Sequence, residues 1–168
     1  MSHLRTLVLL KPDALCRNLV GTIISRFEHA GFDIADTTST VPDESLLATH
    51  YEHLTEESYY PGLVEYMRSG LVIVLVLEGP NAVEEVRDLI GDTEPESADP
   101  GTIRGDLADD SYERADSEGR ALYNLVHASE HPNAAEKEID LWFDCSPRLA
   151  HLQLTAHSTS KAMCSSRG

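Results

Sequence analysis

The sequence contains little cysteine and little lysine, and it has no long hydrophobic run. Its three cysteines, Cys16, Cys145 and Cys164, are odd in number and widely separated, so they provide neither a disulfide framework nor metal-ligand spacing. No apolar run approaches the roughly 20 residues that a membrane-spanning helix needs. The first residues lead directly into an apolar run, so we expect no signal peptide and a reducing, cytoplasmic setting.

Positive charge is also scarce, because 13 basic residues stand against 29 acidic ones and the formal net charge is −16. This excess disfavours long-range attraction to nucleic acid or to anionic membranes, and we expect neither as a partner. A substrate that carries phosphate would therefore need a local cluster of cations. Only Lys11, Lys137 and Lys161 are lysines, a bias that fits either adaptation to salt or a GC-rich genome.

The sequence does contain an alternation of short strand and helix patterns. Apolar, β-prone runs predict strands over 6–10, 32–40, 71–77 and 122–126. Helical spacing and end signals predict helices over 19–29, 42–50, 62–68, 81–90 and 134–143. This order favours an α+β fold, a ferredoxin-like sandwich in which helices cover one face of a four-stranded antiparallel sheet.

Two segments lack this periodicity. Residues 92–119 are rich in Asp, Glu, Ser, Gly and Pro, which predicts a long loop that is either functional or disordered. Residues 144–168 are weakly hydrophobic and rich in serine and histidine, which predicts an extended and partly disordered tail. We therefore expect one compact domain over 1–143, followed by a tail over 144–168.

The segment around His127 is the strongest functional signal. His127 follows a short apolar run, and Glu138 comes eleven positions later on a predicted helix. Such a carboxylate can fix one ring nitrogen as a donor and leave the lone pair of the other nitrogen free to attack. Upstream, residues 100–106 form a compact cationic turn that suits an anion. Together these features favour phosphoryl transfer through a phosphohistidine, while the lack of a GxxxxGK[ST] loop argues against a Walker-type enzyme.

Stretches that follow one another over residues 5–143 resemble the nucleoside diphosphate kinase family. They are Lys11-Pro-Asp13, Val20-Gly21 with Ile24-Ser-Arg-Phe27-Glu28, His50-Tyr51, Pro61-Gly62-Leu63, Gly101-Thr-Ile-Arg104-Gly-Asp106, Asn124-Leu-Val-His127-Ala-Ser129, and Glu136-Lys-Glu138-Ile139 before Leu-Trp-Phe. The resemblance implies a ferredoxin-like kinase domain over 1–143 and a ping-pong reaction between nucleoside triphosphates and diphosphates. It also implies Mg2+ carried with the nucleotide, and a homo-oligomer that is a hexamer or a smaller even assembly.

The same resemblance implies the catalytic residues. His127 would be the nucleophile through Nδ1, and Glu138 would orient its ring. Ser129 would bond near this carboxylate and the phosphates. Lys11 would contribute both to catalysis and to phosphate binding. The other seven histidines, His131 included, are interpreted as structural, and no protein-bound metal site is implied.

The same resemblance implies the residues that bind the nucleotide. Arg87 and Arg104 would join Lys11 at the phosphates, where fixed cations do most of the work of phosphoryl transfer. Thr93 would donate its hydroxyl to the phosphates. The remaining expected contacts are Tyr51 beside the phosphates, Tyr59 stacked on the base, and Asn124 against ribose and phosphate.

The sequence departs from the family pattern in two places. Seventeen residues separate Asp106 from Asn124, and this longer connection implies an inserted acidic loop around 107–119. The insertion could alter assembly, cover the active site or shift base preference. The tail lacks the aromatic, acidic segment that packs on a neighbouring subunit in the family. The alternative interpretation is a catalytically weak, nucleotide-binding regulatory or scaffolding member, which the intact His127 and Glu138 argue against.

Overall fold

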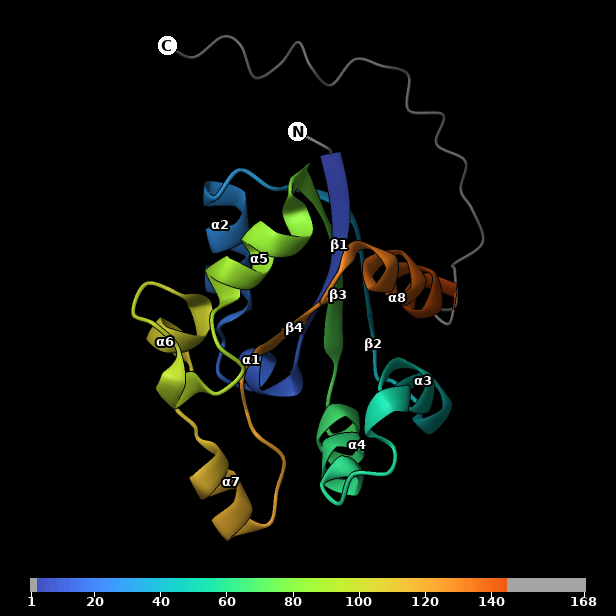
Figure 1. Cartoon of the computed structure of the whole chain (residues 1–168), viewed down its shortest axis with the longest axis vertical. Coiled ribbons are helices and arrows are strands. Elements are labelled where there is room, and N and C mark those ends of the chain that lie inside the picture. The colour runs from blue at the N-terminus through green and yellow to red at the C-terminus, as the bar shows by residue number, and fades with distance from the viewer. Residues whose placement is uncertain (1–2, 145–168) are drawn as a thin grey trace, which may run out of the picture.

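The computed structural model describes residues 3–144, which form one sheet with helices packed around it (Figure 1). The strands are β1 (His3–Leu10), β2 (Asp33–Thr40), β3 (Val72–Pro80) and β4 (Val126–Ala128). The α-helices are α1 (Pro12–Cys16), α2 (Val20–His29), α3 (Glu44–His50), α4 (Tyr60–Arg68), α5 (Ala82–Ile90), α6 (Ile103–Leu107), α7 (Tyr112–Glu118) and α8 (Pro132–Asp144). Two short 3₁₀ helices are η1 (Glu52–Leu54) and η2 (Pro95–Ser97).

The sheet has the strand order β2-β3-β1-β4, and every neighbouring pair is antiparallel. The order of strands and helices along the chain confirms the ferredoxin-like α+β fold that the sequence predicted. In the register of β1 with β4, Leu9 lies opposite His127. The candidate nucleophile is therefore attached to the central part of the molecule by a short edge strand.

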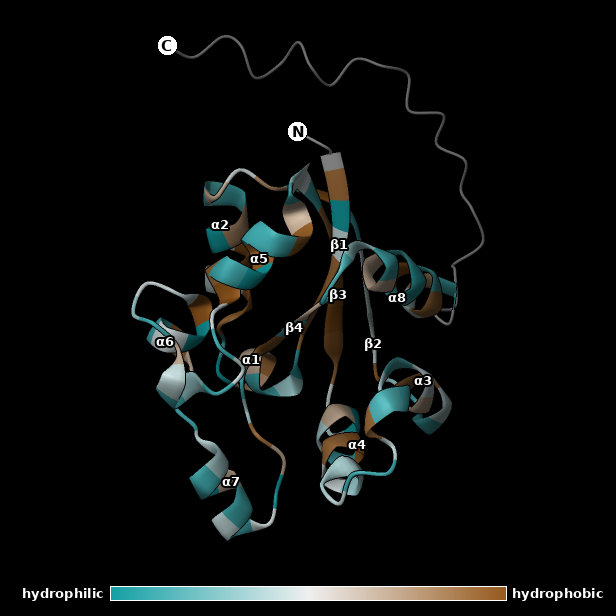
Figure 2. Cartoon of the chain, in the orientation of Figure 1, coloured by the Kyte–Doolittle hydropathy of each residue, from teal (hydrophilic) through white to brown (hydrophobic). Residues whose placement is uncertain are grey.

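Helices cover both faces of the sheet, so the expectation that only one face is covered was wrong. Leu7 and Leu9 of β1 pack in one core with residues of α3, α4 and α8, whereas Val8 and Leu10 pack in a second core with α2 and α5. Figures 1 and 2 show these two groups of helices on opposite sides of β1, with apolar surfaces turned inward. The uninterrupted apolar run of β1 is typical of a strand that is buried on both faces.

The strand predicted over 122–126 begins later than expected, because a tight turn interrupts the run. Leu125 has a positive φ of 67°, and the Val126 N–H donates to the Asn124 carbonyl over 2.7 Å. A fully buried leucine rarely adopts such a backbone. The turn ends the loop, and β4 starts only at Val126, so His127 lies in the middle of the strand.

The prediction of a long loop over 92–119 was also wrong in detail, because this segment contains η2, α6 and α7. Side-chain caps start the two α-helices: Thr102 accepts from the Gly105 N–H, and Ser111 accepts from the Arg114 N–H. Gly119, with a left-handed φ of 62°, ends α7. These helices are too short and too polar to leave an apolar period in the sequence.

An internal ion pair anchors residues 107–119. The Arg120 guanidinium donates to both carboxylate oxygens of Asp110, over 2.6 and 2.9 Å, and Asp110 also accepts from the Tyr123 N–H. Asp110 is buried. Because this carboxylate joins both ends of α7 to the approach to β4, residues 107–119 form a folded element and not a free acidic loop.

The predicted tail lies outside the described residues, apart from Asp144 at the end of α8. Within residues 3–144, none of the helices is both long enough and apolar enough to cross a membrane.

Candidate active site

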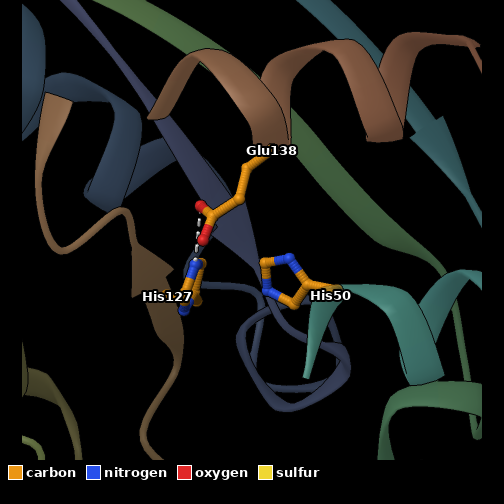
Figure 3. A group of neighbouring side chains, drawn as sticks. All are labelled: His50, His127 and Glu138. Atoms are coloured by element: carbon orange, nitrogen blue, oxygen red, sulfur yellow. Dashed lines mark hydrogen bonds and ion pairs between the residues drawn. The ribbon is translucent and has the colours of Figure 1, made fainter. Parts of the chain in front are cut away.

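His127 on β4 and Glu138 on α8 contact each other directly. The His127 Nε2 lies 3.2 Å from Glu138 Oε2 (Figure 3). Helix α8 packs along β1 next to β4, and this packing brings the carboxylate over the strand from the neighbouring helix. The contact predicted from the eleven-residue spacing is therefore present in the structure.

Ser129 extends this contact into a chain of hydrogen bonds. Its hydroxyl donates to the same Glu138 oxygen over 2.6 Å and accepts from the Leu7 N–H over 3.3 Å. Burial acts to raise the pKa of Glu138, but the hydrogen bond and charge of His127 outweigh it and leave this pKa below its ordinary value. The carboxylate is thus ionised at neutral pH and can only accept. His127 Nε2 must be the donor, which leaves the lone pair on Nδ1.

A cleft of about 1300 Å³ opens beside His127. Of the ten residues assigned from the sequence, all except Ser129 line it. They are Lys11, Tyr51, Tyr59, Arg87, Thr93, Arg104, Asn124, His127 and Glu138. Ser129 is fully buried and reaches the site only through Glu138. The structure therefore brings the predicted residues together from six separate parts of the chain.

The turn at Leu125 holds His127 in place from the other side. The Leu125 N–H donates to Asp13 Oδ2 over 3.1 Å, and the Leu125 carbonyl accepts from the Lys11 N–H over 2.8 Å. Positive-φ residues of this kind persist only where their surroundings hold them, and they cluster at functional sites. Asp13 is thus a supporting residue that the sequence analysis quoted within Lys-Pro-Asp but did not assign.

Lys11 projects from the end of β1 and is almost completely buried. Its Nζ donates to Asn124 Oδ1 over 2.8 Å, and Asn124 in turn donates to the Thr93 carbonyl over 2.8 Å. Burial, with the nearby Arg104 charge, lowers the pKa of Lys11 to about 8. Among the residues that the structure describes, no carboxylate pairs with this ammonium, so it is available for an anion.

Arg104 makes more hydrogen bonds within the protein than the sequence suggested. Four of its N–H groups donate to carbonyl oxygens: Nε to Asn124, Nη1 to Gly91 and Asp92, and Nη2 to Val126. A guanidinium has five N–H groups, so one remains for a ligand. Burial and the charge of Arg87 lower the pKa of Arg104 to about 10. Arg104 therefore both fixes the loop before β4 and places positive charge at the cleft.

The two predicted tyrosines occupy different parts of the cleft. Tyr51 is buried, its ring centroid lies 6.3 Å from that of His127, and its hydroxyl has no hydrogen-bond partner within residues 3–144. Burial raises the pKa of Tyr51, so it stays a neutral donor. Tyr59 is half exposed, as an apolar platform for a ligand would be. Arg87 and Thr93 are exposed at the cleft and offer a cation and a hydroxyl.

His50 was interpreted from the sequence as an ordinary structural histidine, but in the structure it lies beside His127. Among the described residues, His50, His127 and Glu138 form a group whose potential metal-ligand atoms lie within 4.8 Å of one another (Figure 3). Trp142 Nε1–H, however, donates to His50 Nδ1 over 3.1 Å. A neutral ring then carries its proton on Nε2, which cannot ligate a metal without losing that proton. The only sequence signal for His50 was its place beside Tyr51.

The chain is similar to proteins of one family over most of its length. The family model for nucleoside diphosphate kinase matches residues 4–147. The nucleoside diphosphate kinase of Emericella nidulans is 45% identical over 143 residues, which cover 85% of this chain and 87% of that protein. The nucleoside diphosphate kinase of Pyrococcus furiosus is 44% identical over 139 residues, which cover 83% and 82%.

Solved structures show the same similarity. A nucleoside-diphosphate kinase from Borrelia burgdorferi, with bound vanadate and ADP as a transition-state mimic, superimposes with a TM-score of 0.80 at 36% identity, over 84% of this chain and 87% of that one. An NDP kinase from Pyrobaculum aerophilum superimposes with a TM-score of 0.77 at 38% identity, over 84% and 96%.

Proposed function

The chain belongs to the nucleoside diphosphate kinase family, and on that premise we propose that it transfers the terminal phosphoryl group of a nucleoside triphosphate to a nucleoside diphosphate. His127 carries the group between the two nucleotides as a phosphohistidine. The observation that carries this proposal is the chain from Ser129 through Glu138 to His127, which leaves the Nδ1 lone pair free at a cleft that also holds Lys11 and Arg104.

In the first half-reaction, His127 Nδ1 attacks the γ-phosphorus, a bond from nitrogen to phosphorus forms, and the bond to the bridging oxygen of the diphosphate breaks. The nucleoside diphosphate leaves with that electron pair. Lys11 and Arg104 offset the negative charge on the transferred group and the leaving oxygen. The Nε2–H stays on the ring and donates to Glu138, whose negative charge stabilises the positive ring of the phosphohistidine. A second diphosphate reverses these steps.

Mg2+ enters this scheme as part of the substrate, carried on the triphosphate. Mg2+ prefers oxygen ligands and usually binds through phosphates and a few carboxylates. The potential ligand group in the described region contains His50 and His127, which suit other metals. We therefore assign the metal to the nucleotide and not to a site built by the protein.

Four further parts of the proposal concern assembly, location, partners and domain organisation. A homo-oligomer, either a hexamer or a smaller even assembly, and a cytoplasmic location rest on the family and the composition. The net charge of −16 supports a protein that binds neither nucleic acid nor membranes. The single domain over 1–143 with a tail over 144–168 stays a proposal as well. The alternative of a regulatory or scaffolding member is disfavoured by the complete set of catalytic groups at the cleft.

Intact mass spectrometry tests the proposed reaction. The protein is mixed with ATP and Mg2+ without an acceptor, quenched at high pH, and compared with the same sample after GDP is added. We expect one added phosphoryl group that is labile in acid and is discharged by GDP, with the production of GTP. If ATP binds but no adduct forms, the nucleotide-binding alternative replaces this proposal. His29→Ala, which changes an exposed histidine on α2, should be phosphorylated like the parent.

The lowered pKa of Lys11 predicts how nucleotide binding depends on pH. Because its pKa in the free protein is about 8, the ammonium is charged at pH 7 and largely neutral at pH 9. An anion that requires the charged form should therefore bind about tenfold more weakly at pH 9 than at pH 7. Isothermal titration calorimetry with ADP at both values measures this. Lys11→Arg keeps its charge and should flatten the dependence, whereas a flat profile in the parent would remove Lys11 from phosphate binding.

A further inference from the structure

His50 is a buried histidine next to the nucleophile, and the mechanism above leaves it without a role. It is the last residue of α3 and is 7% exposed. Its ring centroid lies 4.6 Å from that of His127, with the two planes at 76°. In Figure 3 the ring of His127 is seen from its edge, and the edge of His50 is turned toward its face.

The proton position on His50 follows from its partner. The indole N–H of Trp142 can only donate, and it lies 3.1 Å from His50 Nδ1. Nδ1 therefore carries a lone pair. Burial and the neighbouring His127 lower the pKa of His50 to about 3, so the ring is neutral at physiological pH. The single proton of a neutral ring is then on Nε2.

This Nε2–H is buried and has no hydrogen-bond acceptor within residues 3–144. A buried donor without an acceptor destabilises a folded protein, so such a group needs an explanation. The geometry supplies one. The positive edge of one ring, with its N–H, faces the negative face of another, which is the favoured arrangement of an edge-to-face pair.

Helix α8 links His50 to the catalytic residues. Glu138 and Trp142 lie four residues apart, one turn along α8, and thus on the same side of the helix. Glu138 holds the His127 Nε2, and Trp142 holds the His50 Nδ1. One helical face therefore fixes the proton of each ring, and the two rings fix each other at a right angle.

We propose that His50 is a positioning residue for His127, acting through its Nε2–H against the face of the His127 ring. Glu138 fixes one atom of that ring, but a single hydrogen bond does not stop the ring from turning about its Cβ–Cγ bond. The edge of His50 blocks this rotation, because a turned His127 ring would collide with it. Nδ1 is thereby kept directed at the cleft. Misplacement of a reacting atom by about 1 Å can cost on the order of 100-fold in rate.

The inference rests on the proposed phosphoryl transfer, and matched substitutions of His50 test it. His50→Leu removes the donor, while His50→Gln keeps an amide donor close to the Nε2 position. Both remove the acceptor of Trp142, so their effects on stability are matched. We expect His50→Leu to slow single-turnover phosphorylation by ATP about tenfold with an unchanged Kd for ADP, and His50→Gln to stay within about threefold of the parent. His29→Leu is the control for the same change at an exposed site.

Each outcome has a distinct meaning. If both variants, checked to be folded, phosphorylate at the parental rate, or if both are slowed equally, the role of the Nε2–H is overturned while the kinase survives. If the parent itself is never phosphorylated, the proposed function fails. NMR of 15N-labelled histidines decides the positioning role without activity. The His50 Nε2–H should exchange slowly and be shifted upfield by the His127 ring, and a rapidly exchanging, unshifted proton would contradict it.

Discussion

His127→Ala should lower steady-state transfer from ATP to GDP by about 10⁴-fold or more, because removal of an attacking group eliminates the covalent route. The Kd for ADP should change by no more than about threefold, since Lys11, Arg104 and Tyr59 are untouched and each lines the cleft from a different segment. Coupled-enzyme kinetics and calorimetry on one preparation measure the two quantities.

His127→Ala should lower the free energy of unfolding by little enough that the protein stays folded. His127 is partly exposed, and Glu138 retains its hydrogen bond from Ser129 after the ring is gone. The loss of one hydrogen bond to a charged group costs about 1.5–3 kcal/mol. If the folded variant turned over ATP and GDP at a parental rate, the nucleophile would have to be another group. If its ADP affinity collapsed, the site would be organised around His127 in a way that the contacts do not indicate.

The fold could be predicted from the sequence because its main strands and helices leave periodic patterns in the local sequence. The apolar runs of β1 and β3 and the apolar stripes of α2 and α5 have the periods of strands and helices, and their order leaves few topologies. The coverage of both faces was missed even though the continuous apolar run of β1 signals it. The short helices α6 and α7 were missed because they depend on caps such as Ser111 and not on an apolar stripe.

The site was predictable where its residues are carried by sequence motifs, and much less so where they act through space. Lys11, His127 and Glu138 belong to stretches that resemble a family. Nothing in the identity of Leu125 indicates a positive φ, because the turn is imposed by Asp13 and Lys11, more than 100 positions away. The proton of His50 depends on Trp142, 92 positions along the chain. Such long-range contacts leave no periodic pattern and no residue preference in the local sequence.

Arg104 shows how a residue that the sequence assigns to one role can also have a second role in the structure. The sequence places it in a cationic turn, which favours anion binding. In the structure its bonds to four carbonyl oxygens tie the segment after α5 to the residues at the start of β4. A substitution of Arg104 would therefore disturb the position of His127 as well as the phosphate site. A substitution of Arg104 therefore separates effects on nucleotide binding from effects on catalysis less cleanly than a substitution of Glu138 does.

Glu138→Gln should lower the rate of His127 phosphorylation about 100-fold while nucleotide affinity stays close to that of the parent. Both Ser129 and His127 donate to the same oxygen, Oε2. A glutamine oxygen can accept both bonds, so the tautomer of His127 is kept, and what is lost is the negative charge opposite the ring. That charge matters most when the ring becomes positive on phosphorylation, so the loss should appear in the rate and not in binding.

A control on the same helix separates this charge from general effects on α8. Glu136 is exposed and forms a surface ion pair with Arg5, so Glu136→Gln removes one carboxylate from α8 without reaching the cleft. Rapid-quench phosphorylation should distinguish the two variants, and equal rates for both would show that the Glu138 carboxylate is not needed.

The pH dependence of stability provides a second test of the Glu138 charge. Because the pKa of Glu138 lies below its ordinary value in the folded protein, its charge stabilises the fold above the ordinary glutamate pKa of about 4.3. That contribution is lost as the pH falls through the lowered pKa. Urea unfolding should therefore show a stability difference between parent and Glu138→Gln that shrinks from pH 7 toward pH 3. A difference that stays constant over this range would mean that the carboxylate acts through its shape and not through its charge.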